Sequence, residues 1–180
     1  MQQKPIRALW RASLLWLALV VAAVPPAHAE TKSLIFERAQ IRIDPRPITN
    51  ADKEVTLTRP PVTLDIELRG EEALSLEYIH TLNTLDDKNG VMILLTSPAI
   101  AALPAMKVYT AVDVLFVAED GTILQISPSL VLGELTQTIQ AKAPIKALLF
   151  IKAGAAAARG LHPRDTVAGR MFQPLAPVQE

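Results

Sequence analysis

A lysine and an aspartate six positions apart are the side chains with the clearest potential for acid–base chemistry in this 180-residue chain. Asp113 lies in an apolar stretch, and Lys107 precedes it. If both reach one end of a sheet, the lysine and burial would shift the carboxylate pKa, as in a small hydrolase, with His80 as a third candidate. The alternative is a structural ion pair or two solvated edge residues, with His80 a solvated helix residue.

The other polar residues predict neither a metal site nor a cofactor. His162, beside Pro163, is expected at the surface. Asp86–Gly90 resembles a calcium loop only superficially, because it lacks alternating ligands and a glutamate at loop position twelve, so we expect a solvated turn. The sequence has no Gly-x-Ser-x-Gly elbow, no His-Glu-x-x-His and no phosphate loop. It also has no cysteine, which excludes thiol catalysis, disulfides and iron–sulfur ligation.

Charge and aromatic content argue against nucleic-acid binding. The first 29 residues hold three basic residues and no acidic one, so the remainder has 15 basic against 18 acidic residues, a formal charge of −3. Nucleic-acid binders need a surplus of lysine and arginine. Both tryptophans lie in those first residues, and the six aromatic residues after them are too few for a base-stacking platform.

The N-terminus has the three regions of a signal peptide. Basic residues come first, Leu14–Val24 is an apolar run of eleven residues, and Ala27-His28-Ala29 is a small-x-small cleavage pattern. We therefore predict export to the periplasm or medium, with cleavage before Glu30. A retained anchor is the alternative, although a membrane span needs about 20 apolar residues.

Short alternating or apolar runs predict about eight strands and two short helices. The alternation of Val62, Leu64, Ile66 and Leu68 with polar residues is the clearest strand signal. Asp120-Gly121 predicts a tight two-residue hairpin turn. The stretches 98–104 and 128–143 are expected to be connectors, the first with room for one helical turn. The predicted strands are 34–43, 55–57, 62–68, 91–95, 107–118, 122–127, 145–152 and a short one around Val167; the helices are 71–82 and 153–159, the latter closed by Gly160.

Long helical patterns rarely separate these strands, which disfavours a doubly wound parallel sheet. We expect a mostly β (α+β) fold, an antiparallel sandwich or open barrel with two short helices at the rim. The predicted parts are a signal peptide (1–29), an N-terminal β extension packed on the domain (30–61), the main domain (62–172) and a flexible tail (173–180).

Several short motifs after Val62 occur in the order of a known family. Gly90–Leu94 forms one apolar strand motif, Met106-Lys107 precedes Val112–Phe116 and Asp120-Gly121, and Gly160–Val167 reads Gly-Leu-His-Pro-Arg-Asp-Thr-Val. In this order the chain resembles the domain-of-unknown-function family 192, over about 105 residues. The resemblance implies a compact, mostly β domain and carries no agreed activity.

The departures from the family pattern fall mainly on polar residues that could mark a family site. Ala105 stands for a tryptophan, Val108-Tyr109 for Asn-Thr, the helix arginine is lost, and Arg164 replaces a glycine of the ending. The resemblance therefore implies a divergent member in which apolar residues replace polar ones.

Two functions follow from these observations. The first is a non-enzymatic module of the cell envelope that binds a small ligand or a protein partner, with Met106, Tyr109 and Tyr78 as the contact zone. It has no nucleic-acid partner and meets the membrane only through the signal peptide. The alternative is a hydrolase-like enzyme that uses Lys107 and Asp113, with His80 nearby.

Overall fold

The computed structural model describes residues 37–49, 55–74, 80–105, 109–135 and 138–172, and residues 35–180 form one compact unit. The strands are β1 (Glu37–Asp44), β2 (Ile48–Thr49), β3 (Val55–Leu57), β4 (Val62–Gly70), β5 (Asn89–Ala99), β6 (Ala102–Leu103), β7 (Ala111–Val117), β8 (Ile123–Val131), β9 (Ile139–Gln140), β10 (Ile145–Lys152) and β11 (Thr166–Ala168). The helices are three short 3₁₀ helices, η1 (Glu71–Leu74), η2 (His80–Thr84) and η3 (Leu132–Glu134), and one α-helix, α1 (Ala155–Ala158).

Seven strands form one sheet in the order β11-β1-β4-β5-β10-β7-β8. Every neighbouring pair is antiparallel except β4 and β5, which are parallel. Two short ribbons, β2-β3 and β6-β9, lie outside this sheet. The predicted mostly β class is confirmed. β1, predicted as part of an N-terminal extension, is an inner strand paired on both sides.

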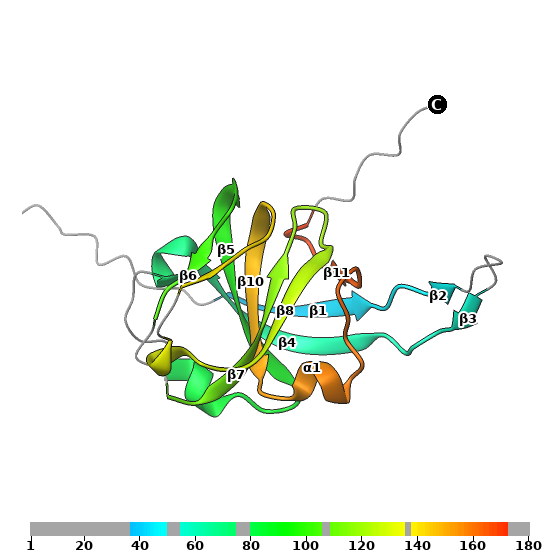
Figure 1. The fold of residues 1–180 in the computed structure, drawn as a ribbon, viewed down its shortest axis with the longest axis horizontal. Helices are drawn as coiled ribbons and strands as arrows, with labels where there is room; N and C mark the ends of the chain where they lie inside the picture. The colour runs from blue at the N-terminus through cyan, green and yellow to red at the C-terminus, as the bar shows by residue number, and fades with distance from the viewer. Residues whose placement is uncertain (1–36, 50–54, 75–79, 106–108, 136–137, 173–180) are drawn as a thin grey trace, which may run out of the picture. The chain divides into compact units, whose positions relative to one another are not determined.

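The sheet curls until its two edge strands meet at one end. In Figure 1, β1 and β4 run steeply across the direction of β5 and β10. The start of β8 bonds to the segment that leads into β11, with Val167 N–H donating to the Gly121 carbonyl at 2.8 Å and Ile123 N–H to the Asp165 carbonyl at 2.8 Å. The result is an open barrel that is partly closed where residues 164–167 bond to residues 121–123 at the start of β8.

Alternating side chains fill two separate apolar clusters. One contains residues from both ends of the sheet, such as Ile43 and Leu64 opposite Leu115 and Leu149, so the curled sheet encloses it. The other, centred on Phe116 and Phe150, lies on the opposite face, where η1, η2, η3 and the β6-β9 ribbon cover it. Because β10 is buried on both faces, it reads as a continuous apolar run.

The Asp-Gly hairpin has three loop residues, which corrects the two-residue prediction. Ala118 N–H donates to the Thr122 carbonyl at 2.8 Å, and Gly121 N–H donates to the Ala118 carbonyl at 3.1 Å. This is the three-residue loop that ends with a left-handed glycine. Gly121 has φ +82°, and a Cβ there would lie 2.3 Å from the Val167 carbonyl oxygen. The site therefore needs glycine both for the turn and for barrel closure.

Tertiary packing changes three other local predictions. The described parts of the predicted helix 71–82 are the 3₁₀ helices η1 and η2. β5 runs to Ala99 and β6 follows, so the described connector around Pro98–Pro104 contains no helical turn. β8 continues through Pro128 to Val131, beyond its predicted end at Ser127. Ser129, at φ +51°, marks the irregularity that lets β8 continue past the proline.

Candidate functional site

A buried polar cluster joins three distant segments through Asp165. This residue has no exposed surface. Arg59, just before Pro60-Pro61, binds the Asp165 carboxylate with both terminal nitrogens. Its Nη2 lies 2.7 Å from Oδ1, and its Nη1 lies 3.0 Å from Oδ2. The backbone N–H groups of Arg46 and His162 donate to the same carboxylate at 2.9 and 2.8 Å. We call these four residues the clasp.

The Arg59 guanidinium also fixes the backbone around it. Its Nη1 donates to the Gly160 carbonyl, and its Nη2 lies 3.3 Å from the Arg46 carbonyl. The clasp thus connects the chain after β1, the chain before β4 and the loop before β11. A bidentate arginine–carboxylate pair is a strong, orientation-specific contact. The clasp therefore holds the loop 160–165 in place at the point where the barrel closes.

The protonation of Asp165 is coupled to the fold. Burial alone raises the pKa of its carboxyl, but the hydrogen bonds from Arg59 and from the His162 and Arg46 backbones outweigh burial and hold the pKa below the ordinary value of 3.8. A folded-state pKa below the unfolded value stabilises the protein above that unfolded value. This contribution is lost as the pH falls through the folded-state pKa.

We therefore expect the free energy of unfolding to fall as the pH drops below about 4. Denaturant unfolding between pH 7 and pH 2.5 measures this dependence, and Asp165→Asn should flatten it in the acid range. An Asp165→Asn profile parallel to that of the wild type would show that this carboxylate does not couple folding to pH.

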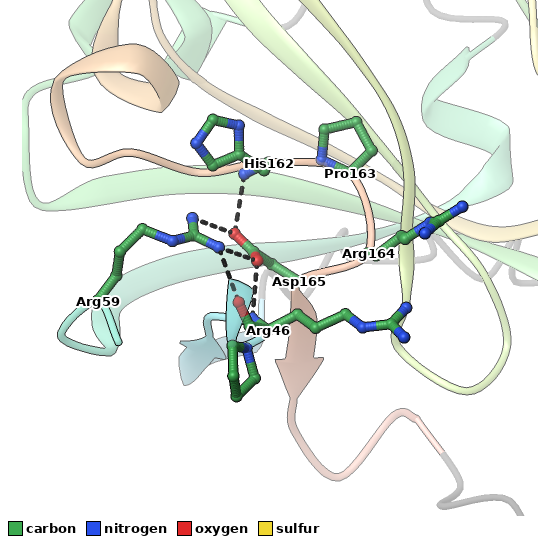
Figure 2. A pocket seen from close by; sticks show the side chains of 7 residues that line it. Arg46, Arg59, His162, Pro163, Arg164 and Asp165 are labelled. Atoms are coloured by element: carbon green, nitrogen blue, oxygen red, sulfur yellow. Dashed lines mark hydrogen bonds and ion pairs between the residues drawn. The ribbon is translucent and has the colours of Figure 1, made fainter. Parts of the chain in front are cut away.

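A pocket of about 320 Å³ opens beside the clasp. We call it the basic pocket; its lining residues are Arg46, Pro47, Arg59, His162, Pro163, Arg164 and Asp165. Figure 2 shows Arg59 directed at Asp165, whereas the side chains of Arg46, Arg164 and His162 extend away from that carboxylate. The clasp uses the backbones of Arg46 and His162 and leaves their side chains to the pocket.

Arg164 occupies a position that suits glycine. Its φ is +79°, in the left-handed region, and the family pattern has glycine at this place in the ending. A left-handed conformation costs a residue with a Cβ about 1–2 kcal/mol. The structure thus explains the glycine of the pattern, and the chain keeps an arginine there despite the strain.

Replacing Arg164 by glycine should raise the free energy of unfolding by about 0.5–1 kcal/mol, since relief of strain exceeds the entropy that glycine adds to the unfolded state. Denaturant melts measure the gain. Arg164→Ala is the matched control, because it removes the same charge but keeps the Cβ, and it should give no gain. Equal stability of the two variants would contradict the strain argument.

Asp113, the candidate carboxylate of the alternative hydrolase hypothesis, is fully buried in β7. Its Oδ1 accepts N–H groups from Ser129 at 2.8 Å and Gly154 at 3.0 Å, and its Oδ2 accepts the Ala156 N–H at 2.9 Å. The carboxylate thus holds the irregularity in β8 and the first turn of α1. Its contacts are those of a structural group.

The other predicted site residues are only partly described. Lys107, Met106 and Tyr78 lie outside the described residues, and His80 begins η2 with a side chain that is likewise not described. Tyr109 is 70% exposed. A Cβ on Gly133 would lie 2.8 Å from the tyrosine ring, so the ring rests on Gly133. His162 is at the surface, as predicted.

A second hollow of about 660 Å³ lies over β1, β4 and residues 81–90. Several of its polar groups are paired with one another: Gln40 donates to Asp65 at 3.1 Å, and Thr81 donates to Glu67 at 3.0 Å. Glu67 also forms an ion pair with Arg69. Two basic residues line this hollow beside three acidic ones, so it lacks the net positive charge of the basic pocket.

The described residues contain no group of three or more His, Cys, Asp or Glu side chains that could hold a metal ion. Within the same residues, no helix is both long and apolar enough to cross a membrane.

The fold and site define a small, mostly β domain with a buried arginine–aspartate clasp beside a basic pocket. A family profile for an uncharacterized group, the domain-of-unknown-function family 192 (DUF192, "Uncharacterized ACR"), matches residues 56–169. The chain belongs to this family.

Two solved structures are similar to the chain. A protein of Sinorhizobium meliloti 1021, to which a role in transcription regulation has been ascribed, has a TM-score of 0.59 and 20% identity, covering 76% of this chain and 97% of that one. A protein of unknown function from Novosphingobium aromaticivorans has a TM-score of 0.59 and 22% identity, covering 82% and 94%. At these identities the likeness shows the fold alone. No curated protein matches the chain.

Proposed function

We propose that the chain is an exported module of the cell envelope that binds a ligand without transforming it, and that the basic pocket is its binding site. The observation that carries the proposal is the division of roles in this pocket. Arg59 neutralises the buried Asp165, and backbone N–H groups donate hydrogen bonds to it. The exposed arginine and histidine side chains that line the opening of the pocket remain available to a ligand.

The backbone hydrogen bonds of the Asp113 carboxylate favour a binding function over a catalytic one. A general base must reach the proton that it removes. The Asp113 carboxylate is buried and already accepts three backbone N–H groups, so it has little capacity for a substrate. The hydrolase alternative would need Lys107 beside this carboxylate.

Nuclear magnetic resonance tests binding and catalysis together. A ¹⁵N-labelled chain from Glu30, which keeps the compact unit 35–180, is mixed with a small-molecule extract of the envelope. We expect shifts of the amides of residues 160–167 that reverse on dialysis, with an unchanged mass spectrum of the extract. Consumption of an extract component at catalytic protein concentration would favour the enzyme instead. Unshifted pocket amides would contradict the assignment of the site.

Export is tested separately. A reporter enzyme that is active only outside the cytoplasm is fused after residue 29. The matched control deletes Leu14–Val24, the apolar run on which the signal peptide prediction depends. We expect activity from the first fusion alone, and equal activity of the two fusions would contradict export through this segment.

A further inference from the structure

Three side chains of the basic pocket have hydrogen-bonding capacity that the described chain does not use. Among the described residues, the guanidinium groups of Arg46 and Arg164 and the imidazole of His162 form no ion pair or side-chain hydrogen bond. All three residues are exposed. The two nearest acids along the chain are occupied, since Asp44 binds Arg42 at 2.5 Å and Asp165 binds Arg59.

The charge at the opening is therefore uncompensated. Arg59 and Asp165 cancel each other, which leaves the two guanidinium charges of Arg46 and Arg164. Guanidinium groups match phosphate and carboxylate oxygens through paired N–H donors. Two such groups suit a single group with two negative charges and several acceptor oxygens.

The clasp also preorganises the backbone of the pocket for ligand binding. Arg46 and His162 are anchored through their backbone N–H groups to Asp165, and Arg164 lies between His162 and Asp165 in a left-handed turn. Backbones fixed in advance reduce the entropy lost on binding. The strain at Arg164 is consistent with a side chain kept for its charge.

We infer that the basic pocket binds a phosphate monoester, carried by a small molecule or by a lipid headgroup. The phosphate would contact Arg46 and Arg164, whose side chains extend to the same side of Asp165 in Figure 2, and the organic part would lie along Pro47 and Pro163 toward His162. The pocket volume of about 320 Å³ equals that of about ten waters at liquid density, which is enough for a phosphate and a small organic group. This inference rests on the proposed function and specifies its ligand.

Titration of the ¹⁵N-labelled chain with inorganic phosphate and with glycerol 3-phosphate tests the inference, with glycerol as the neutral control. Both phosphates should shift the amides of His162, Arg164 and Asp165, and higher salt should weaken binding. Arg46→Gln and Arg164→Gly should each weaken binding at least about fivefold, on the scale of one charge-assisted hydrogen bond. Arg38→Gln is the matched control, an exposed arginine outside this pocket, and should bind as the wild type does.

Weaker binding in these two variants should not result from a loss of folding. Arg46→Gln keeps the backbone N–H that the clasp uses, and Arg164→Gly relieves strain. Sedimentation with vesicles of phosphatidylcholine, with and without phosphatidic acid, separates the two sources of phosphate. Binding to the acidic vesicles that the soluble phosphates compete away identifies a lipid headgroup; binding of the soluble phosphates alone identifies a small molecule.

Unchanged affinity in Arg46→Gln and Arg164→Gly, or shifts spread evenly over the surface, would overturn the inference. Pocket shifts with the envelope extract but none with the phosphates would overturn the ligand class and leave the proposed function standing. Pocket shifts with neither would overturn both.

Discussion

Replacing Arg59 by methionine will lower the free energy of unfolding by about 3–5 kcal/mol, the range expected when one partner of a buried ion pair is removed. Asp165 would keep its two backbone donors but lose both guanidinium contacts, and its charge would remain fully buried. The Gly160 carbonyl would also lose its Arg59 donor. Denaturant unfolding at pH 7 measures the loss.

Two further variants separate the charge of Arg59 from its shape. Arg59→Lys keeps the charge but loses the bidentate fork, so it should fall between the wild type and the methionine variant. The pair Arg59→Met with Asp165→Leu removes both charges and should regain part of the loss, because no unpaired charge stays buried. Arg38→Met is the surface control. An Arg59→Met variant as stable as this control would contradict the structural role of the clasp.

Asp113→Ala will have the second large effect, a loss of about 3–4 kcal/mol in the free energy of unfolding. The substitution leaves three backbone N–H groups without their acceptor; the bond from Ala156 is buried and those from Ser129 and Gly154 are part-buried. A buried unsatisfied donor costs about 1–3 kcal/mol. Hydrogen exchange should show the loss first at Ser129 and in α1, the two places that this carboxylate holds.

Matched variants identify the cause of the Asp113 effect. Asp113→Asn keeps one acceptor oxygen and should lose less than the alanine variant. Asp87→Ala removes an exposed carboxylate whose partner is Lys152, and it should stay close to the wild type. If Asp113→Ala matched Asp87→Ala in stability, Asp113 would not be a structural group, and the catalytic interpretation would regain support.

The local residue pattern predicted the strands in which apolar residues form a nearly continuous run or alternate regularly with polar ones. β10 was predicted with its bounds because its run of apolar residues is buried on both faces, and β4 was predicted to within two residues of its end because its apolar residues alternate. The two-residue strands β6 and β9 have too little pattern to predict. The parallel pairing of β4 with β5 depends on how the whole sheet curls, which no local signal contains.

The site was harder to predict because distant segments build it. Arg59 and Asp165 are 106 positions apart, and the proline-rich segments around Arg46 and Arg59 read only as strand ends. The one available signal is the acid within the family's ending, Asp165, and the sequence does not connect it to either proline-rich segment. Asp113 was predicted as a polar residue in an apolar strand, but its backbone partners depend on the irregularity in β8.

A crystal structure of the chain from Glu30 with glycerol 3-phosphate tests the central claim most directly. The account predicts the phosphate between Arg46 and Arg164, with Arg59 still paired to Asp165. A phosphate bound elsewhere, or one that pulls Arg59 away from Asp165, would contradict the division between a structural clasp and a binding pocket.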